Sequence, residues 1–376
     1  MGRETMTSLE SRIKAQAYGL GFDLVGIARL GPADTAPAYE RWLSRGFAGE
    51  MDYLARGLDK RRDSTRPVPG ATSGIVVGMN YGGRQPAGPI ARYARGDDYH
   101  TVLRSKLESL HRWLGMAMAR EVHGRAYVDT GPVLERDLAR RAGLGWFGKN
   151  TNLIHPTLGS YFFLGVLLVE IELEPDEPFE ADRCGSCRRC LDACPTSALV
   201  EPRVLDATRC ISYLTIELRG AIPRELRPLV GDLVYGCDIC QDVCPWNVRF
   251  ARAPTEPALA PRPENVAPDP RDFLSLGELE FRTRFRKSAI KRAKRRGLAR
   301  NAAVALGNRR RREDVPALVD ALGDADPLVR GHAAWALGRT GTSEAIAALQ
   351  AREQFEGDPF VLDEIRDALS GARAVR

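Results

Sequence analysis

The sequence lacks a long apolar run and a leader segment, and most of the chain lacks cysteine. The longest apolar run, residues 161–171, is far shorter than the roughly 20 residues needed to span a bilayer. Charged residues begin at the third position, so no basic and apolar leader opens the chain. We therefore expect a cytoplasmic protein without a membrane-spanning segment.

All eight cysteines lie between positions 184 and 244. A chain of 376 residues can bury a large core, so it does not need disulfides to fold. A reducing compartment also disfavours a disulfide framework. Clustered thiols indicate a metal centre instead, and Cys-x2-Cys pairs taken alone fit either structural zinc or iron-sulfur clusters.

The spacing of the cysteines favours iron-sulfur clusters. The run "CGSCRRCLDACP", residues 184–195, has the pattern of a bacterial ferredoxin, in which the cysteine before proline binds the neighbouring cluster. A second run, "CDICQDVCP" at residues 237–245, lacks its first cysteine because Val234 stands there, and Cys210 can replace it. We therefore predict two 4Fe-4S clusters. Their ligands are Cys184, Cys187, Cys190 and Cys244 for the first, and Cys194, Cys210, Cys237 and Cys240 for the second.

Residues 1–175 alternate between helix and strand patterns. The expected helices are residues 8–22, which begin with the capping residue Ser8, and residues 101–120. The expected strands are residues 22–30, 73–83 and 125–131. Such alternation predicts a mixed α/β domain whose sheet is covered on both faces and whose ligand crevice lies at the strand ends.

Three loops of this domain carry polar residues suited to chemistry. Asp129 ends a strand in "VDTGPV", and Pro132 is placed to open the next helix, so the carboxylate suits either a helix cap or a catalytic acid. The loop "GLGWFGKNTNLI", residues 143–154, matches neither a Walker loop nor a dinucleotide fingerprint. The loop "ARYARGDDYH", residues 91–100, concentrates charge but also fits a solvated connection. None of these loops decides the function alone.

Prolines and a repeat organise the C-terminal part. Residues 251–270 carry six prolines and predict an extended linker or an arm wrapped on the body. The segment "LARNAAVALGN" at position 298 recurs as "VRGHAAWALGR" at position 329, an offset of 31 residues. This period predicts HEAT-like helical pairs, too few to stand alone, so we expect them to dock on the rest of the protein.

Basic charge is confined to one segment. Residues 282–312 contain fourteen Lys and Arg and no Asp or Glu, whereas the whole chain carries +6, which leaves −8 for the remainder. A stretch of one sign on a folded element is typical of a surface that binds a phosphate backbone, and it favours nucleic acid over a membrane or solvation alone. The candidate contacts are Lys291, Arg292, Lys294, Arg295 and Arg296.

Together these motifs resemble the epoxyqueuosine reductase family over nearly the whole chain. The resemblance rests on "GEMDYLARG" at residues 49–57, "ARYARGDDYH", residues 128–154, the doubled cysteine run with its displaced Cys210, and the terminal repeats. Members of this family carry out the last step of queuosine synthesis by removing an epoxide oxygen from the modified wobble base of tRNA. They use cobalamin beside two clusters, and their catalytic domain is related to that of reductive dehalogenases.

The resemblance implies roles for particular residues. Asp129 would protonate the opening epoxide oxygen, with its pKa raised above about 3.9 by burial against the corrin. Cobalamin would bind base-off, without a histidine from the protein; the usual Asp-x-His-x-x-Gly signature is absent because Leu103 replaces its glycine after Asp98 and His100. The implied corrin contacts are Tyr53, Arg56, Arg92, Tyr93, Asp129, Lys149, Asn150, Ser160, Ser212, Tyr213, Gln241 and Asp242.

The resemblance also implies the partners and the organisation of the chain. The partners are a tRNA with a GUN anticodon that carries epoxyqueuosine and an electron donor such as ferredoxin or flavodoxin, and the protein is expected to be a monomer. The fold class is α+β. The expected parts are a mixed α/β cobalamin-binding catalytic domain over residues 1–175, a ferredoxin-like two-cluster domain over 176–250, a proline-rich linker over 251–270, and a HEAT-like tRNA-binding domain over 271–376.

Three other functions remain open at this point. A corrinoid reductase of the reductive dehalogenase type shares the cofactors, although such respiratory enzymes usually carry a twin-arginine leader, which this sequence lacks. A ferredoxin-like electron-transfer protein on an RNA-binding scaffold would bind clusters but no corrinoid. An RNA-binding HEAT protein with a structural metal would contain zinc in place of iron.

Overall fold

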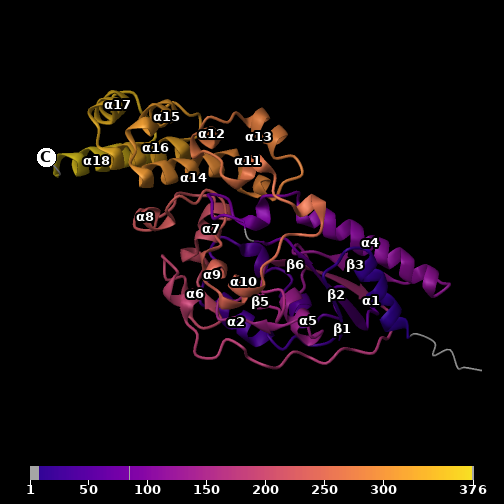
Figure 1. The fold of residues 1–376 in the computed structure, drawn as a ribbon. Coiled ribbons are helices and arrows are strands. Elements are labelled where there is room, and N and C mark those ends of the chain that lie inside the picture. Colours follow the sequence, from indigo (N-terminus) through magenta and orange to yellow (C-terminus); the bar gives the residue numbers. More distant parts are fainter. Residues whose placement is uncertain (1–7, 84, 375–376) are drawn as a thin grey trace, which may run out of the picture.

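The computed structural model describes residues 8–83 and 85–374. Figure 1 shows an elongated molecule with a sheet and its helices at one end and a helical array at the other. Short helices from residues 184–250, the cysteine-bearing segment, lie between them. None of the helices in these residues is long and apolar enough to cross a bilayer.

The sheet is antiparallel throughout, with the strand order β1-β2-β6-β3. Its strands are β1 (Leu24–Arg29), β2 (Ser73–Asn80), β6 (Phe162–Val169) and β3 (Gly124–Tyr127). The register pairs Asn80 with Phe162 and Tyr127 with Val166. As a result, β2 and β3 both end at the edge of the sheet where β6 begins.

Helices cover both faces of this sheet, as predicted. Helices α1 (Leu9–Gly19) and α4 (Tyr99–Ala117) cover one face, and α5 (Glu135–Arg141) covers the other. Ser8 caps α1 as expected, because its Oγ accepts a hydrogen bond from the backbone of Ser11. The prediction for Pro132 is wrong: α5 begins at Glu135 with Leu134 as its N-cap, so Pro132 lies outside the helix and Asp129 does not cap it.

The cysteine-bearing segment is built from short elements. Helix α6 (Arg189–Asp192) lies against α9 (Ile239–Asp242), and α10 (Pro245–Phe250) follows directly. The hairpin of β7 (Leu199–Glu201) and β8 (Val204–Leu205) and the helices α7 (Ile211–Ile216) and α8 (Arg227–Val230) connect the two cysteine runs. The contact between α6 and α9 therefore brings the two runs together.

Residues 251–270 pack along the sheet end of the protein. The side chain of Asn80 donates a hydrogen bond of 2.8 Å to the carbonyl of Ala253, and the backbone of Asp97 donates one of 2.8 Å to Ala258. Further along, the backbone of Arg262 donates one of 3.0 Å to Arg95, just before α11 (Pro263–Val266). These contacts correspond to a wrapped arm and not to an extended linker.

The C-terminal array consists of stacked helical pairs. Three long helices lie side by side: α14 (Lys294–Arg309), α16 (Pro327–Thr340) and α18 (Pro359–Ala374). The helices α12 (Pro270–Leu274), α13 (Glu278–Arg284), α15 (Val315–Ala321) and α17 (Ser343–Glu353) pack beside them. The repeated small residues allow this close packing, since a Cβ added to Gly307 would lie 2.7 Å from the ring of Trp335. The predicted HEAT-like repeat is confirmed.

The array docks on the cysteine-bearing segment, as expected, through one continuous core and a buried ion pair. Apolar residues of α7 and α8 belong to the same buried cluster as those of α14, α16 and α18. Within it, Arg227 of α8 donates two hydrogen bonds of 2.8 Å to Glu364 of α18, and the two side chains are only 2% and 3% exposed. A buried charge without its partner is costly, so this pair joins the two parts specifically.

We predict that Glu364→Ala lowers the free energy of unfolding by about 3–5 kcal/mol, because it leaves the Arg227 guanidinium buried without a counter-charge. The matched control is Asp363→Ala, which removes an exposed partner of Arg224 and should cost only about 0–1 kcal/mol. Urea unfolding followed by circular dichroism measures both changes. Equal losses in the two variants would contradict an anchoring role for the buried pair.

Candidate active site and cysteine centres

A cavity of about 370 Å³ opens where β2 and β3 end and β6 begins. This is the crevice at the strand ends that the sequence predicts. Its lining combines aromatic rings with acidic and basic groups from the loop that follows β3 and from the start of α5. The lining residues are Tyr81, Tyr93, Tyr99, Asp129, Glu135, Arg136, Asn152, Leu153, Ser160, Phe162, Phe163 and Leu164.

Asp129 stands in this cavity on a constrained backbone. Its φ of 58° lies in the left-handed region, which non-glycine residues adopt rarely and mostly at turns or functional sites. The carboxylate accepts a hydrogen bond of 2.9 Å from the hydroxyl of Tyr99, and Nε2 of His100 lies 3.4 Å away. Protein atoms surround the carboxylate, yet 66% of the side-chain surface remains accessible, so it can meet a bound molecule.

His100 lies between two carboxylates. Its Nδ1 is 2.7 Å from Asp98, and its Nε2 faces Asp129. Burial acts to lower the pKa of His100, but the hydrogen bonds to Asp129 and Asp98 outweigh it and raise the pKa to about 9. The ring is therefore a cation at neutral pH, and both of its nitrogens are occupied as donors.

The hydrogen bonds around Asp129 act on its pKa in the direction opposite to burial. Burial acts to raise this pKa, but the hydrogen bonds from His100 and Tyr99 hold it below its ordinary value. Because most of the side chain is accessible, these hydrogen bonds outweigh burial. The expected rise in this pKa depends on burial against the corrin and stays a prediction; the sequence did not show that an imidazolium faces this carboxylate.

Glu135 supplies a second carboxyl group with the opposite behaviour. Burial and the nearby charge of Asp129 raise its pKa to about 8, and its Oε1 is buried without a hydrogen-bond partner. At neutral pH the cavity therefore contains one ionised and one protonated carboxyl group, a division typical of acid-base sites. The sequence analysis missed Glu135, Tyr99 and the role of His100, although Glu135 follows the quoted Asp129 motif.

Aromatic rings form one wall of the cavity. Tyr99 stacks between His100 and Phe163, with ring centroids 4.0 Å away on each side. Tyr93 meets Tyr99 edge-on at 6.2 Å and lies 6.1 Å from Tyr235. This packing holds the hydroxyl of Tyr99 at Asp129, so the hydrogen bond between them is part of a rigid wall.

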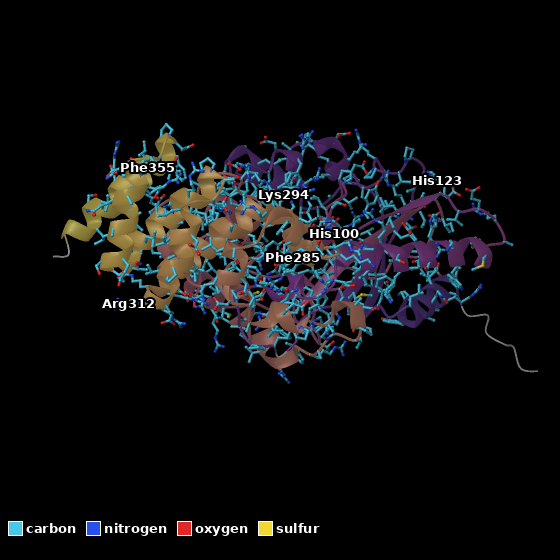
Figure 2. All side chains as sticks on the ribbon, turned by 90° about the horizontal axis from the view of Figure 1, so that it is seen from above. His100, His123, Phe285, Lys294, Arg312 and Phe355 are labelled. Atoms are coloured by element: carbon cyan, nitrogen blue, oxygen red, sulfur yellow. The ribbon has the colours of Figure 1, made fainter. Side chains whose placement is uncertain are left out.

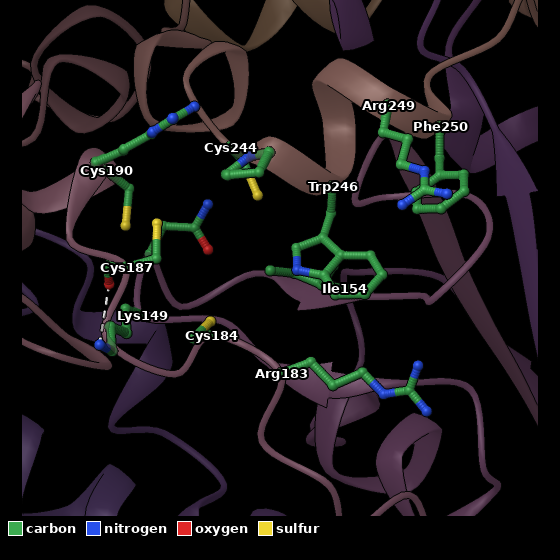
Figure 3. Close-up of a pocket in the computed structure, with 13 residues that line it drawn as sticks. Lys149, Ile154, Arg183, Cys184, Cys187, Cys190, Cys244, Trp246, Arg249 and Phe250 are labelled. Atoms are coloured by element: carbon green, nitrogen blue, oxygen red, sulfur yellow. Dashed lines mark hydrogen bonds between the residues drawn. The ribbon is translucent and has the colours of Figure 1, made fainter.

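Four cysteines surround a second cavity of about 280 Å³. Figure 3 shows the sulfurs of Cys184, Cys187 and Cys190 from the first run around one space with that of Cys244 from the second run. Lys149, one of the expected corrin contacts, donates a hydrogen bond of 2.9 Å to the carbonyl of Cys187. Lys149 therefore secures the loop that carries the first run.

The other four cysteines form a second group. Burial raises the pKa of Cys237 to about 12, and the nearby thiols of Cys210 and Cys194 add to the effect. Burial also raises the pKa of Cys240 well above its ordinary value, with further increases from Cys237, Cys210 and Cys190. Among residues 8–83 and 85–374, no three closely spaced His, Cys, Asp or Glu side chains form a site for a single metal ion.

A buried junction joins the first cavity to the second cysteine run. Arg92, 7% exposed, uses its backbone N–H and its guanidinium to bind Asp238 at 2.8 and 3.2 Å, and its guanidinium binds Asp242 at 2.5 Å. Gln241 donates two hydrogen bonds of 3.1 Å to Ser160, whose backbone lines the cavity edge. Asn150 also reaches this run, through a hydrogen bond of 3.3 Å to the carbonyl of Cys240. The structure thus brings these predicted residues together between the cavity and the thiols.

The remaining predicted cofactor residues lie on helix α7 and on a segment that contacts it. The hydroxyl of Tyr213 accepts a hydrogen bond of 2.9 Å from the backbone of Glu50, so α7, which carries Ser212, meets the segment that carries Tyr53. Tyr53 is 38% exposed and close enough to Asp129 for that charge to contribute to its raised pKa, behind the larger effects of burial and two nearer charges. Arg56 is exposed on the same segment.

The basic segment is only partly available to a ligand. Arg292 forms two hydrogen bonds with Glu217, at 2.9 and 2.8 Å, and its guanidinium lies 5.4 Å from the ring of Tyr53. Arg295 binds Asp324 at 2.8 Å, and Arg296 lies 3.8 Å from Asp326. These three predicted nucleic-acid contacts therefore already face carboxylates.

Lys291 and Lys294 differ from the three arginines. Both are exposed, and within residues 8–83 and 85–374 neither forms an ion pair; the same holds for Lys287. Lys291 lies near the first cavity, because its charge contributes to the lowered pKa of Asp98. Figure 2 places Lys294 and His100 in the middle of the molecule, between Phe355 of the array and His123 of the sheet end.

Three family models match the chain. One, described as epoxyqueuosine reductase QueG, DUF1730, matches residues 61–130. A 4Fe-4S double cluster binding domain matches residues 183–247, and HEAT repeats match residues 284–370. The three matches fall on the sheet end, the cysteine-bearing segment and the array.

Relatives and solved structures agree with these matches. The chain is 41% identical over 342 residues to an epoxyqueuosine reductase of Escherichia coli, which covers 88% of this chain and 89% of the relative. It resembles a crystal structure of an epoxyqueuosine reductase with an epoxyqueuosine-modified tRNA-Tyr stem loop, with a TM-score of 0.89, 32% identity, and coverage of 97% and 99%. A Bacillus subtilis epoxyqueuosine reductase with its catalytic aspartate loop swung out of the active site gives a TM-score of 0.87, 32% identity, and coverage of 96% and 98%.

We predict that His100 titrates near pH 9 in the folded, oxidised protein, far above the value of about 6.5 for an unfolded chain. The stability that its ion pairs contribute is fully present below about pH 6.5 and is lost as the pH rises through about 9. NMR of histidine-labelled protein measures the titration, and His100→Gln assigns the signal.

Two comparisons sharpen this titration. Asp98→Asn should lower the pKa of His100, since it removes one of the two facing carboxylates. His155, whose pKa is lowered to about 4 by burial, serves as an internal reference in the same spectra. A midpoint for His100 at or below 6.5 would contradict the bridging position of its ring.

Proposed function

The chain belongs to the epoxyqueuosine reductase family, and we propose that it removes the epoxide oxygen of epoxyqueuosine at the wobble position of tRNA, forming queuosine. The observation that carries this proposal is the cavity lined by Asp129 and Glu135, with His100 at Asp129, which Gln241 and Ser160 join to the second cysteine run. The solved relative with a modified tRNA stem loop supports the same substrate class.

The overall reaction sets what the site must supply. Conversion of an epoxide to an alkene takes up two electrons and two protons and releases water. Iron-sulfur clusters pass electrons one at a time, so two clusters beside the cavity suit stepwise delivery. We propose that Cys184, Cys187, Cys190 and Cys244 hold one cluster and that Cys194, Cys210, Cys237 and Cys240 hold the other.

We propose that cobalamin binds in the Asp129 cavity without a histidine ligand. The nitrogens of His100 are both engaged by carboxylates, so this ring has none to offer to cobalt. Buried polar atoms without partners, Oε1 of Glu135 and Nε of Arg92, fit the amide-rich rim of a corrin. When bound, cobalamin supplies a reduced cobalt nucleophile for the epoxide carbon.

Several residues are positioned to hold such a group. Tyr93 and Ser160 line the cavity and are the first contacts we propose. The other proposed contacts are Arg92, Asn150, Gln241 and Asp242 at the junction, Tyr53 and Arg56 on the segment after Glu50, Ser212 and Tyr213 on α7, and Lys149 beside the first cysteine run.

We propose that Asp129 delivers the proton to the opening epoxide oxygen. At neutral pH the carboxylate itself is ionised, but protons are held next to it on His100 and on Glu135. His100 can pass a proton from Nε2 to Oδ2 of Asp129, across the contact of 3.4 Å that the structure shows. Two neighbouring proton donors match the two protons that the reaction takes up.

The test of this function is anaerobic turnover of the cluster-loaded protein with epoxyqueuosine tRNA, a chemical reductant and added cobalamin. We expect cobalamin-dependent loss of one oxygen, read by nucleoside mass spectrometry. Asp129→Asn should lower the rate by about 10²–10⁴-fold, because the amide cannot transfer a proton. Iron content and tRNA affinity should stay at the level of the unchanged protein, and full turnover by this variant would overturn the role of Asp129.

The exposed lysines give a second prediction, for tRNA binding. Replacing Lys287, Lys291 and Lys294 by glutamine should reduce the salt dependence of tRNA affinity, by about 0.7–0.9 in logarithmic slope for each phosphate that is no longer neutralised. The matched control replaces Arg282, Arg296 and Arg312, which are exposed but already face Glu278, Asp326 and Glu344. If the lysine variant and the arginine variant changed the salt slope equally, internal ion pairing would not decide which cations bind the RNA.

A further inference from the structure

The cavity of the first cysteine group has a one-sided charge. It is lined by four cations, and its described lining contains neither Asp nor Glu. These cations are Lys149, Arg183, Arg189 and Arg249. Figure 3 shows Arg183 and Arg249 beyond Trp246 on the side away from Cys190, where they edge the cavity.

The three arginines are exposed and keep their charge. Among residues 8–83 and 85–374, no ion pair involves Arg183, Arg189 or Arg249, whereas the nearby Arg203 binds Asp182 at 2.6 Å. Arg183 and Arg249 rest on aromatic rings instead, 5.4 Å from Phe179 and 5.0 Å from Phe250. Stacking leaves their N–H groups free for an external anion.

An apolar centre accompanies these charges. Val248 is 64% exposed on α10, and its backbone donates a hydrogen bond of 3.0 Å to the carbonyl of Cys244. Trp246 and Phe250 on the same helix are only partly buried and stack on each other at 5.7 Å. An apolar patch rimmed by charge is typical of a protein-binding surface, and it differs from a strip of cations that follows a nucleic-acid backbone.

This surface, the two cysteine groups and the Asp129 cavity follow one another in the structure. The first cysteine group borders the surface, and its Cys190 lies on α6, which contacts α9, the helix that carries Cys240 of the second group. Gln241 of the second run binds Ser160, which lines the Asp129 cavity. A path for electrons therefore runs from this surface through the first and second groups to the cavity.

We propose that the surface formed by Arg183, Arg189, Val248 and Arg249 is the docking site of a small acidic electron-carrier protein. This inference rests on the proposed function, because it requires a cluster at Cys184, Cys187, Cys190 and Cys244. In each encounter one electron leaves the carrier and enters that cluster, so the carrier is oxidised by one electron and the cluster is reduced by one. Carboxylates of the carrier pair with the arginines, and its apolar centre covers Val248.

The experiment measures the rate at which reduced flavodoxin, an acidic carrier without iron, reduces the cluster-loaded protein, followed by the EPR signal of the reduced cluster. We expect the double variant Arg183→Glu with Arg249→Glu to slow this step by about tenfold or more at low salt. In this variant the rate should no longer decrease as the ionic strength rises. The charge-conserving pair Arg183→Lys with Arg249→Lys should keep most of the rate. Arg29→Glu, at an exposed position on the sheet, is the matched control and should change nothing.

A second reductant separates docking from an effect on the cluster. Photoreduced deazariboflavin is small and uncharged, so its rate should be the same in all variants, and the midpoint potential of the cluster should not move. An unchanged flavodoxin rate in the double glutamate variant would overturn the docking site, as would equal slowing with both reductants. A cluster-loaded protein that neither reductant reduces would instead refute the proposed function on which the docking site rests.

Discussion

A buried guanidinium must be paired, and in this protein that requirement fixes the position of the redox centre. Arg92 lies on the loop after β2, and its partners Asp238 and Asp242 flank Cys240 on the second cysteine run. Removal of either carboxylate would leave a charge buried without full compensation, which is costly in a low-dielectric interior. The pairing therefore holds the thiols against the end of the sheet where Asp129 stands.

The cavity at this edge of the sheet also holds the carboxyl groups that can transfer protons. Asp129 and Glu135 are both carboxyl groups in one cavity, but they differ because Asp129 accepts hydrogen bonds from Tyr99 and His100, whereas one oxygen of Glu135 is buried without a partner. Hydrogen bonds to the ionised form and desolvation shift pKa values in opposite directions. At neutral pH, Asp129 is therefore ionised and accessible to a bound molecule. The protonated Glu135 and His100 can resupply it with protons.

The helical array contributes more than a basic surface. Arg227 and Arg300 are almost fully buried, and Arg300 donates to the carbonyls of Leu214, Leu218 and Gly220 in the cysteine-bearing segment. Arg292 reaches Glu217 in the same segment. Part of the basic charge therefore holds the array in place, and only the lysines and arginines that lack internal partners remain for an external ligand.

Spacing along the chain was sufficient to predict the two cysteine groups, three of the four strands of the sheet and the helical repeat, whereas the resemblance to the family singled out Asp129 as a catalytic residue. Thiols three residues apart and apolar residues at helical or strand periods are local features, so they can be read without a fold. Folding in three dimensions was needed to show that His100 faces Asp129, that Glu135 lines the same cavity as Asp129, and that Arg292 is paired whereas Lys291 forms no ion pair within the described part of the chain. Arg292 and its partner Glu217 are 75 residues apart in the sequence. A pKa shift and an ion pair both depend on the distance between groups in space, which the spacing of residues along the chain does not give.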